Sequence, residues 1–402
     1  MSRNAQEYID CLFKRLLAHT RFSPEKSASL SIDLKTKDAP SDVQSRFREI
    51  KFSEITDPNK DEGKDTIIDL IPLATGGIAV KMSYKHTKSL VLIGSQIKSE
   101  ELKNIPLDIF EYDESPDLAL FLILNKEFEQ YFHIKSQVSP ENIENILDIV
   151  SDSYEGHSVE DVSDFYDSVY TLNINSDSVL TNNTTELVIE LSRFVPSLLH
   201  CKDIEFINLI NRLSKSEYID KPMLYDSLIS FYSKHAFLDI YRCLEKLFYF
   251  AEVYLLRQEF LKNYSNFTLE IKKLKSILCE SKLSWNRTEK VSITKLFQLV
   301  LRNEDGSLDE NNFNKIYKES IFGDLNGILK GLVDEIAMTN KKAEYLASGV
   351  YKYRNSLVHH EDKEYKKVKK LSAQEWQILA NSVAYFLLAF IQKFDNTLEE
   401  QS

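Results

Sequence analysis

The chain has 402 residues, of which 43% are hydrophobic and 28% charged, with only 10 Gly and 9 Pro. This length is too great for one ordinary core and predicts two or three domains, while the low Gly and Pro content argues against a disordered or loop-rich chain. Charged residues interrupt every apolar run before the roughly 18 residues that a membrane span needs, so we expect no membrane segment.

Cysteine usage and the first residues indicate the compartment. Cys11, Cys201, Cys243 and Cys279 lie far apart and form no CxxC or Cys/His cluster, which excludes the usual zinc spacings and fits buried thiols in a reducing compartment. Residues 1–17 carry charged side chains throughout, unlike a signal peptide. We therefore expect a cytoplasmic protein without a metal site.

The formal net charge is −12, and it is distributed unevenly along the chain. Residues 1–175 hold 19 Lys/Arg and 31 Asp/Glu, whereas residues 176–402 hold 31 of each. An acidic surface repels nucleic acid, but a neutral half with local basic clusters need not. The charge balance thus opposes RNA binding by the front half much more than by the back half.

The front half has a β-like pattern. Strands are expected where apolar and polar residues alternate or where apolar residues run together: residues 29–34, 66–71, 78–84, 89–93 and 118–124. Gly76 and Gly77 predict a hairpin turn, because glycine adopts positive φ easily. Ser139 and Pro140 predict the start of a helix. We expect residues 1–175 to form an α+β domain.

The back half has a helical pattern almost throughout. The polar, turn-prone residues 176–185 are the predicted domain boundary. Beyond them, apolar side chains recur at helical spacing over residues 204–213, 237–260 and 346–357, and Ser372 with Glu375 predicts a capping box that opens the last helix. We therefore expect an all-α bundle over residues 186–402.

The residues best suited to chemistry lie near the end of one of these helices, in the run 353–360. Arg354, Asn355 and His359 occur there within six residues. An arginine can hold a phosphate group through two hydrogen bonds and stabilise the charge that builds on it. A histidine can transfer protons near neutral pH. Together they indicate a phosphodiester substrate.

The sequence Arg-Asn-Ser-Leu-Val-His resembles the Arg-x4–6-His motif of the HEPN superfamily, whose small helical-bundle domains are in many cases metal-independent ribonucleases. Residues 240–248 are similar to the first core helix of that family, which often carries a polar residue facing the motif, and Glu245 is the candidate. Residues 376–394 would form the closing helix. The resemblance covers about residues 230–395.

The resemblance implies an endoribonuclease that needs no cofactor. His359 would act as a general base or acid on the RNA 2′-hydroxyl or the leaving oxygen, Arg354 would stabilise the pentavalent phosphate, and Asn355 would orient one of them. Arg354 and His359 lie about 140° apart around an ideal helix, whereas Asn355 and His359 share a face. Family members resolve this by pairing two motifs across a two-fold axis, which implies a homodimer.

Several alternatives remain open at this point. His360 could replace His359, because both spacings occur in the family. Glu245 could instead pair with Arg242 or Lys246 on a solvated face. Four lysines downstream are candidates for RNA phosphate contacts or for a merely solvated run: Lys366, Lys367, Lys369 and Lys370. Glu361 stands where some members carry a modified tyrosine, so a nucleotidyltransferase partner is not expected.

The resemblance also suggests a biological role. Proteins of this kind are commonly antiviral defence or toxin effectors that cleave host or phage RNA, so a phage-derived or cellular activator is expected at residues 1–175. The acidic front half could restrain the nuclease by covering a basic groove. The alternative hypothesis is a helical module without catalytic activity that mediates oligomerisation or partner binding.

Overall fold

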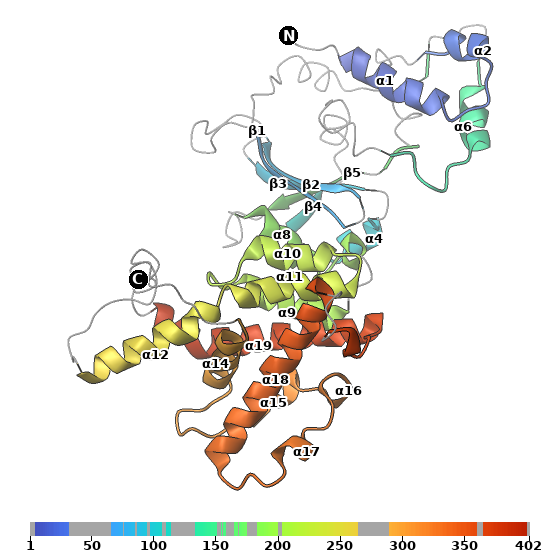
Figure 1. The fold of residues 1–402 in the computed structure, drawn as a ribbon. Helices are drawn as coiled ribbons and strands as arrows, with labels where there is room; N and C mark the ends of the chain where they lie inside the picture. Colours follow the sequence, from blue (N-terminus) through green and yellow to red (C-terminus); the bar gives the residue numbers. More distant parts are fainter. Residues whose placement is uncertain are drawn as a thin grey trace. The chain divides into compact units, whose positions relative to one another are not determined.

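The computed structural model describes residues 5–31, 66–106, 110–113, 133–150, 154–157, 165–174, 183–199, 203–263, 289–359 and 365–399, apart from residues 75, 85–86, 95–96, 155 and 168. The chain divides into two compact units, Met1–Cys201 and Lys202–Ser402 (Figure 1). The division lies later than the predicted boundary at residues 176–185. The reason is that helix α8 (Thr184–Leu191) packs against strands β1 and β2 of the first unit.

The first unit is built on an antiparallel sheet with the strand order β1-β2-β3-β5-β4. Its strands are β1 (Thr66–Pro72), β2 (Ile78–Tyr84), β3 (Thr87–Ile93), β4 (Phe110–Asp113) and β5 (Val169–Ile174). The predicted strands at residues 66–71, 78–84 and 89–93 are confirmed. Of the predicted strand 29–34, Ser29 ends a helix and residues 32–34 lie outside the described residues, as does 118–124.

The hairpin between β1 and β2 follows from its glycines. Gly76 has φ +83°, and its N–H donates to the Leu73 carbonyl at 3.1 Å. Gly77 lies so close to the backbone of Ile93 that a Cβ atom would collide with it. The turn therefore needs one glycine for its dihedral angle and the next for space, and the predicted hairpin is confirmed.

Short helices accompany the sheet: α1 (Ala5–Leu17), α2 (Pro24–Ser29), α4 (Ser99–Leu102), α6 (Pro140–Leu147), α8 and the 3-10 turn η3 (Pro196–Leu198). Helix α6 begins as predicted, because the Ser139 side chain accepts from the Asn142 N–H and Pro140 follows it. The buried Tyr166 hydroxyl donates to the Leu12 carbonyl of α1 at 2.7 Å. Within the described residues the front half thus combines an antiparallel sheet with helices.

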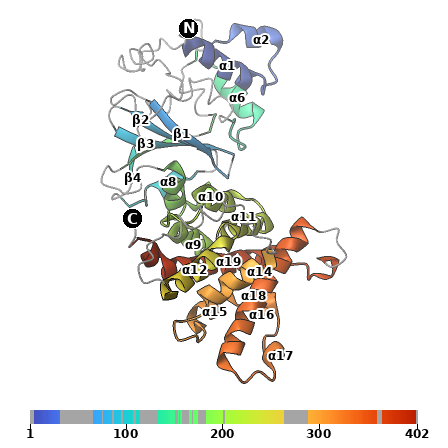
Figure 2. The same cartoon turned by 60° about the vertical axis from the view of Figure 1, so that its left-hand side comes forward.

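The second unit is largely helical in its described residues, which also include an isolated bridge between Arg302 and Leu308 (Figure 2). Its helices are α9 (Ile204–Ser214), α10 (Lys221–Ile229), α11 (Ser233–Glu245), α12 (Phe248–Asn263), α14 (Glu289–Val300), α15 (Glu310–Ile316), α16 (Glu319–Phe322), α17 (Asn326–Leu329), α18 (Glu335–Val358) and α19 (Ala373–Glu399), with the 3-10 turn η4 (Tyr365–Lys367) before α19. The predicted sequence of an α+β half followed by a helical half is therefore correct at this level.

One predicted helix, over residues 237–260, is in fact two, because the chain turns between α11 and α12. The Leu247 N–H donates to the Leu244 carbonyl at 3.0 Å, one residue closer than in an α-helix. The tighter turn leaves Leu244, Leu247 and Phe250 all buried. Packing thus overrides a sequence pattern that is continuous across the turn.

Helix α19 is the centre of the bundle and contacts α9, α11, α14, α15 and α16. It opens with the predicted capping box, in which the Ser372 and Glu375 side chains each accept the other's backbone N–H. The stretch Ala373–Phe394 is long and apolar enough to cross a membrane, and most of it is buried inside the protein. We expected no stretch of this composition, and its apolar character suits the centre of a bundle.

Aromatic contacts tie this central helix to its neighbours. The Phe386 ring stacks on Phe297 of α14 with 3.8 Å between ring centroids, and the Trp376 ring lies 5.4 Å from Phe237 of α11. Because α11 ends at Glu245 and α14 begins at Glu289, these contacts fix two carboxylates relative to the same helix. Helix α18 packs along α14 and completes this side of the bundle.

We expect Phe386→Ala to lower the free energy of unfolding of the helical unit by about 3–5 kcal/mol, because it leaves a cavity under the fully buried Phe297 ring. Chemical denaturation followed by circular dichroism measures the change. Phe231→Ala is the matched control, since Phe231 is 66% exposed, and it should change stability by less than about 0.5 kcal/mol. Equal losses in the two variants would show that the ring stack does not stabilise the bundle.

Candidate functional site

The predicted motif forms the end of the 24-residue helix α18. Asp334 caps the start of this helix by accepting the Ile336 N–H, and buried Leu346, Val350 and Tyr353 form its inner face. The helix ends at Val358, and His359 follows as its C-cap with its N–H donating to the Asn355 carbonyl at 2.7 Å. The motif thus combines two residues inside a rigid helix with one at its end.

Arg354 joins three helices through its guanidinium. Its Nη2 lies 2.8 Å from Glu245 Oε1 at the end of α11, and its Nη1 lies 3.3 Å from Glu289 Oε2 at the start of α14. Its side chain is only 17% exposed, so these ion pairs are screened less than surface pairs. Arg354 is therefore a partly buried cation that faces two carboxylates.

The contacts of Glu245 decide between its two predicted roles, a residue that faces the motif or a surface partner of Arg242 or Lys246. Arg242 pairs with Asp239 at 2.8 Å, and Lys246 pairs with Asp220, so neither of these neighbours is bonded to Glu245. Glu245 instead reaches Arg354, which lies 109 residues further along the chain. The structure thus places Glu245 against the motif.

Asn355 connects Arg354 to the turn that follows the helix. Its side chain is buried, its Oδ1 accepts from Arg354 Nη1 at 2.9 Å, and its Nδ2 donates to the Tyr365 hydroxyl at 3.0 Å. The Tyr365 ring in turn lies 6.4 Å from the His359 ring, measured between centroids. Asn355 therefore orients the guanidinium and, through Tyr365, fixes the chain beside the imidazole.

Tyr241 forms the floor beneath Arg354. The carbon of the guanidinium lies 5.6 Å from the centroid of its ring. Burial, with the charge of Glu245 adding to it, raises the pKa of Tyr241 well above its ordinary value, so the phenol stays neutral. Its hydroxyl is buried and has no hydrogen-bond partner within the described part of the chain. A low-dielectric surface of this kind strengthens the charge interactions above it.

The remaining predicted residues lie outside this network. His359 is exposed at the end of α18, while His360 and the side chain of Lys366 lie outside what the structure describes. Lys367 and Lys370 are exposed. Lys369 pairs with Glu375 at 2.6 Å, which raises the pKa of Lys369 and lowers that of Glu375 to about 2. Lys369 thus has a carboxylate partner that a phosphate would have to displace.

Two members of the network were not predicted from the sequence. Glu289 lies 65 residues before Arg354 in a segment without a recognisable motif, and no local signal could have indicated it. Tyr365 lies inside the lysine-rich run, where an aromatic residue among cations offered a weak signal. Both join the network through tertiary contacts, which sequence spacing does not report.

This arrangement determines how a phosphate could bind Arg354. In the described state the positive charge of Arg354 is compensated, so a phosphate must replace a carboxylate to bind it. Glu289 is the weaker of the two partners, since it is 45% exposed and 3.3 Å away, whereas Glu245 is 29% exposed and 2.8 Å away. Displacing Glu289 would leave Arg354 anchored by Glu245 and Asn355, with one edge open to an anion.

Comparison with known proteins adds nothing to this geometry, because the chain matches no family model, no curated protein and no solved structure. The resemblance to HEPN domains therefore depends on the motif and on the helices of residues 230–395. Neither the site residues nor an activity is transferred from a relative.

We expect Arg354→Ala to lower the free energy of unfolding by about 1–3 kcal/mol, because it leaves two carboxylates facing each other in a partly buried place. Thermal and chemical denaturation measure the change. In the control Arg242→Ala, which removes an arginine that is 59% exposed, the loss should stay below about 1 kcal/mol. Combining Arg354→Ala with Glu245→Gln should recover part of the stability. No recovery would mean that the pair carries little interaction energy.

Proposed function

We propose that the helical unit is a metal-independent endoribonuclease domain of the HEPN type. Arg354, Asn355 and His359 are the catalytic residues, and Glu245 positions Arg354. The observation that supports this proposal is the network at the end of α18, where Glu245 and Asn355 orient Arg354, and Asn355 also bonds Tyr365, whose ring lies 6.4 Å from that of exposed His359. A phosphodiester needs such a pair of groups, one for its charge and one for its proton.

The reaction balances with these groups alone. The imidazole of His359 accepts the proton of an RNA 2′-hydroxyl, and the 2′-oxygen attacks the adjacent phosphorus. The bond from phosphorus to the 5′-oxygen breaks, and that oxygen takes up a proton from a second imidazole, the His359 of a second copy of the chain. The products are a cyclic phosphate and a free 5′-hydroxyl. The Arg354 guanidinium stabilises the additional negative charge on the phosphate during the transfer.

A homodimer belongs to this proposal. One imidazole can accept the first proton, but the leaving oxygen needs a donor as well, and each chain contributes a single His359. Two copies related by a two-fold axis would bring two imidazoles and two guanidinium groups to one phosphate. The exposed position of His359 at a helix end leaves it available to such a partner.

The cellular role follows as part of the same proposal. A cytoplasmic nuclease of this kind would act as an antiviral or toxin effector, with the unit Met1–Cys201 as the sensor of a phage-derived or cellular activator. Lys367 and Lys370 are exposed and would contact RNA phosphates, joined by Lys366 and, after release from Glu375, by Lys369. The carboxylate of Glu289 would hold the nuclease inactive until RNA or an activator displaces it.

One observation favours the second candidate function, a helical module for oligomerisation or partner binding. Arg354 already has two carboxylate partners, as an arginine with a purely structural role would. Such a module would need neither an exposed imidazole nor a displaceable carboxylate. The two functions therefore differ in what His359 contributes.

We expect His359→Ala to reduce RNA cleavage by about 100-fold or more, because general acid–base catalysis contributes at least that much. The measurement is the decay of labelled total RNA on a denaturing gel, in buffer containing a metal chelator. Arg354→Ala should be equally inactive, and Arg242→Ala should keep the activity of the original chain. His359 is exposed, so its removal tests chemistry without disturbing the fold. Intact RNA with all four proteins, under activating conditions, would favour the binding module.

We expect Glu289→Gln to increase cleavage at low RNA concentration by several-fold, because the amide no longer competes with phosphate for Arg354. The change should appear as a lower KM with little change in kcat. Glu245→Gln should act in the opposite sense and lower kcat, since Arg354 loses its closest anchor. Steady-state kinetics on a short labelled RNA separates the two effects. A loss of activity in both variants would assign Glu289 to positioning and exclude its role as a restraint.

A further inference from the structure

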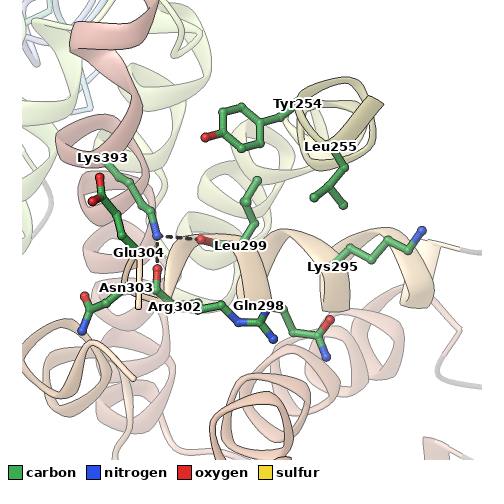
Figure 3. Close-up of a pocket in the computed structure, with 9 residues that line it drawn as sticks. All are labelled: Tyr254, Leu255, Lys295, Gln298, Leu299, Arg302, Asn303, Glu304 and Lys393. Atoms are coloured by element: carbon green, nitrogen blue, oxygen red, sulfur yellow. Dashed lines mark hydrogen bonds between the residues drawn. The ribbon is translucent and has the colours of Figure 1, made fainter. Parts of the chain in front are cut away.

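A cavity of about 240 Å³ lies at the other end of α14, between that helix, α12 and α19 (Figure 3). Nine residues line it: Tyr254, Leu255, Lys295, Gln298, Leu299, Arg302, Asn303, Glu304 and Lys393. Tyr254 and Leu255 face it from α12, Gln298 and Leu299 from α14, and Lys393 reaches in from α19. The cavity therefore has an apolar wall opposite a polar one.

The polar wall carries more positive than negative charge, with three cations and one carboxylate among the lining residues. Arg302 and Lys393 form no ion pair within the described residues, while Lys295 pairs with Glu252 at 2.8 Å. Glu304 contributes the single negative charge among the lining residues. The chain as a whole is acidic, with a net charge of −12, so a cavity with two cations that form no ion pair differs in sign from the chain as a whole. Their field favours an anion.

The two cations are held in place by neutral groups. Lys393 Nζ donates to the carbonyls of Leu299 at 2.8 Å and Val300 at 3.3 Å, and also to that of Arg302. Arg302 Nη2 donates to Asn340 Oδ1. Neutral acceptors fix the position of a cation without cancelling its charge. The three N–H donors of Lys393 are used by these carbonyls, so Lys393 would attract an anion through its charge, and Arg302 would supply the hydrogen bond.

The environment also shows that this charge is unsatisfied. Desolvation of the Lys393 ammonium lowers its pKa and the nearby Arg302 guanidinium adds to this, while the Asp309 and Glu304 carboxylates act in the opposite direction and leave the net shift downward. Arg302 Nε is buried and has no hydrogen-bond partner among the described residues. A bound anion would offset the cost at Lys393, because it supplies an opposite charge.

The other lining groups indicate what the anion is attached to. Tyr254 offers an aromatic surface, and Leu255 extends it. The Gln298 amide has no hydrogen bond within the described part of the chain and can both donate to and accept from a flat polar edge. Aromatic stacking, an amide and a cation together are the groups that recognise an unpaired nucleotide. The volume of about 240 Å³ is below the roughly 300–1,000 Å³ of pockets for drug-sized ligands, so the cavity accepts one nucleotide at most.

We propose that this cavity binds one nucleotide, with its phosphate toward Arg302 and Lys393 and its base against Tyr254 and Leu255, where Gln298 contacts the edge of the base. The nucleotide is either a free mononucleotide or one unpaired nucleotide of an RNA chain. This proposal does not depend on the nuclease activity, because none of the lining residues belongs to the network of Arg354.

The first test is calorimetric titration of the full-length protein with the four nucleoside 5′-monophosphates, the corresponding nucleosides and inorganic phosphate. At least one monophosphate should bind saturably, and its nucleoside and phosphate should each bind at least about tenfold more weakly, because each lacks half of the contacts. If inorganic phosphate binds as tightly as every monophosphate, the cavity is a general anion site and the assignment to a nucleotide is wrong.

Variants locate the binding in the cavity. Arg302→Gln should weaken it by about tenfold or more, the loss expected for a charge-assisted contact. Gln298→Ala removes a side chain without internal bonds, so it should fold normally and weaken binding by a few-fold. Lys330→Gln is the control, since this exposed lysine at the end of α17 does not line the cavity and changes the net charge equally. Unchanged affinity in both cavity variants would overturn the proposal.

A second titration identifies the source of the nucleotide. A labelled single-stranded RNA is added to His359→Ala, in which cleavage would be blocked. RNA binding that Arg302→Gln weakens, without binding of free mononucleotides, assigns the cavity to RNA, and the reverse pattern assigns it to a free nucleotide. Binding of neither ligand overturns the proposal. A chain that binds the nucleotide but cleaves no RNA would refute the nuclease and leave this cavity as assigned.

Discussion

The burial of α19 is the constraint on which the helical unit depends. Its apolar side chains can leave water only if other helices surround it, and α9, α11, α14 and α15 do so. The ring contacts of Trp376 and Phe386 then set the positions of α11 and α14. The carboxylates at the ends of those helices, Glu245 and Glu289, consequently arrive on either side of Arg354. The burial of the apolar side chains of α19 thus brings the charged groups around Arg354 together.

The charged site around Arg354 is compatible with two states, one with two carboxylates and one with a phosphate in place of one of them. A guanidinium beside two carboxylates is stable, and the same guanidinium beside one carboxylate and a phosphate would also be stable. The difference between the two states is the position of Glu289, the more exposed and more distant partner. Buried Asn355 and neutral Tyr241 stay the same in either state, because neither carries a charge that could compete. A small movement at the start of α14 would therefore decide whether Arg354 is open to an anion.

Helix α14 also connects the two sites. Its 12 residues span about 18 Å, with Glu289 at one end and the cavity of Gln298 and Leu299 near the other. The Phe297–Phe386 stack holds the helix to α19 between them. Because a helix moves as a rigid rod over such a length, a ligand that shifts its C-terminal end would also shift Glu289. Helix α14 thus contributes residues to both sites.

The sequence by itself determined the local features. Alternation and glycine placement predicted the β1–β2 hairpin, Ser139 and Ser372 predicted two helix starts, and helical periodicity predicted the inner face of α18, since each of these depends on neighbours within a few residues. Only the tertiary structure decided that α11 and α12 are separate, that Glu289 and Tyr365 join Arg354 and Asn355, and that Arg302 and Lys393 share a cavity. Periodicity reports which face of an element is buried, whereas the pairing of charges between distant elements depends on how those faces pack against one another.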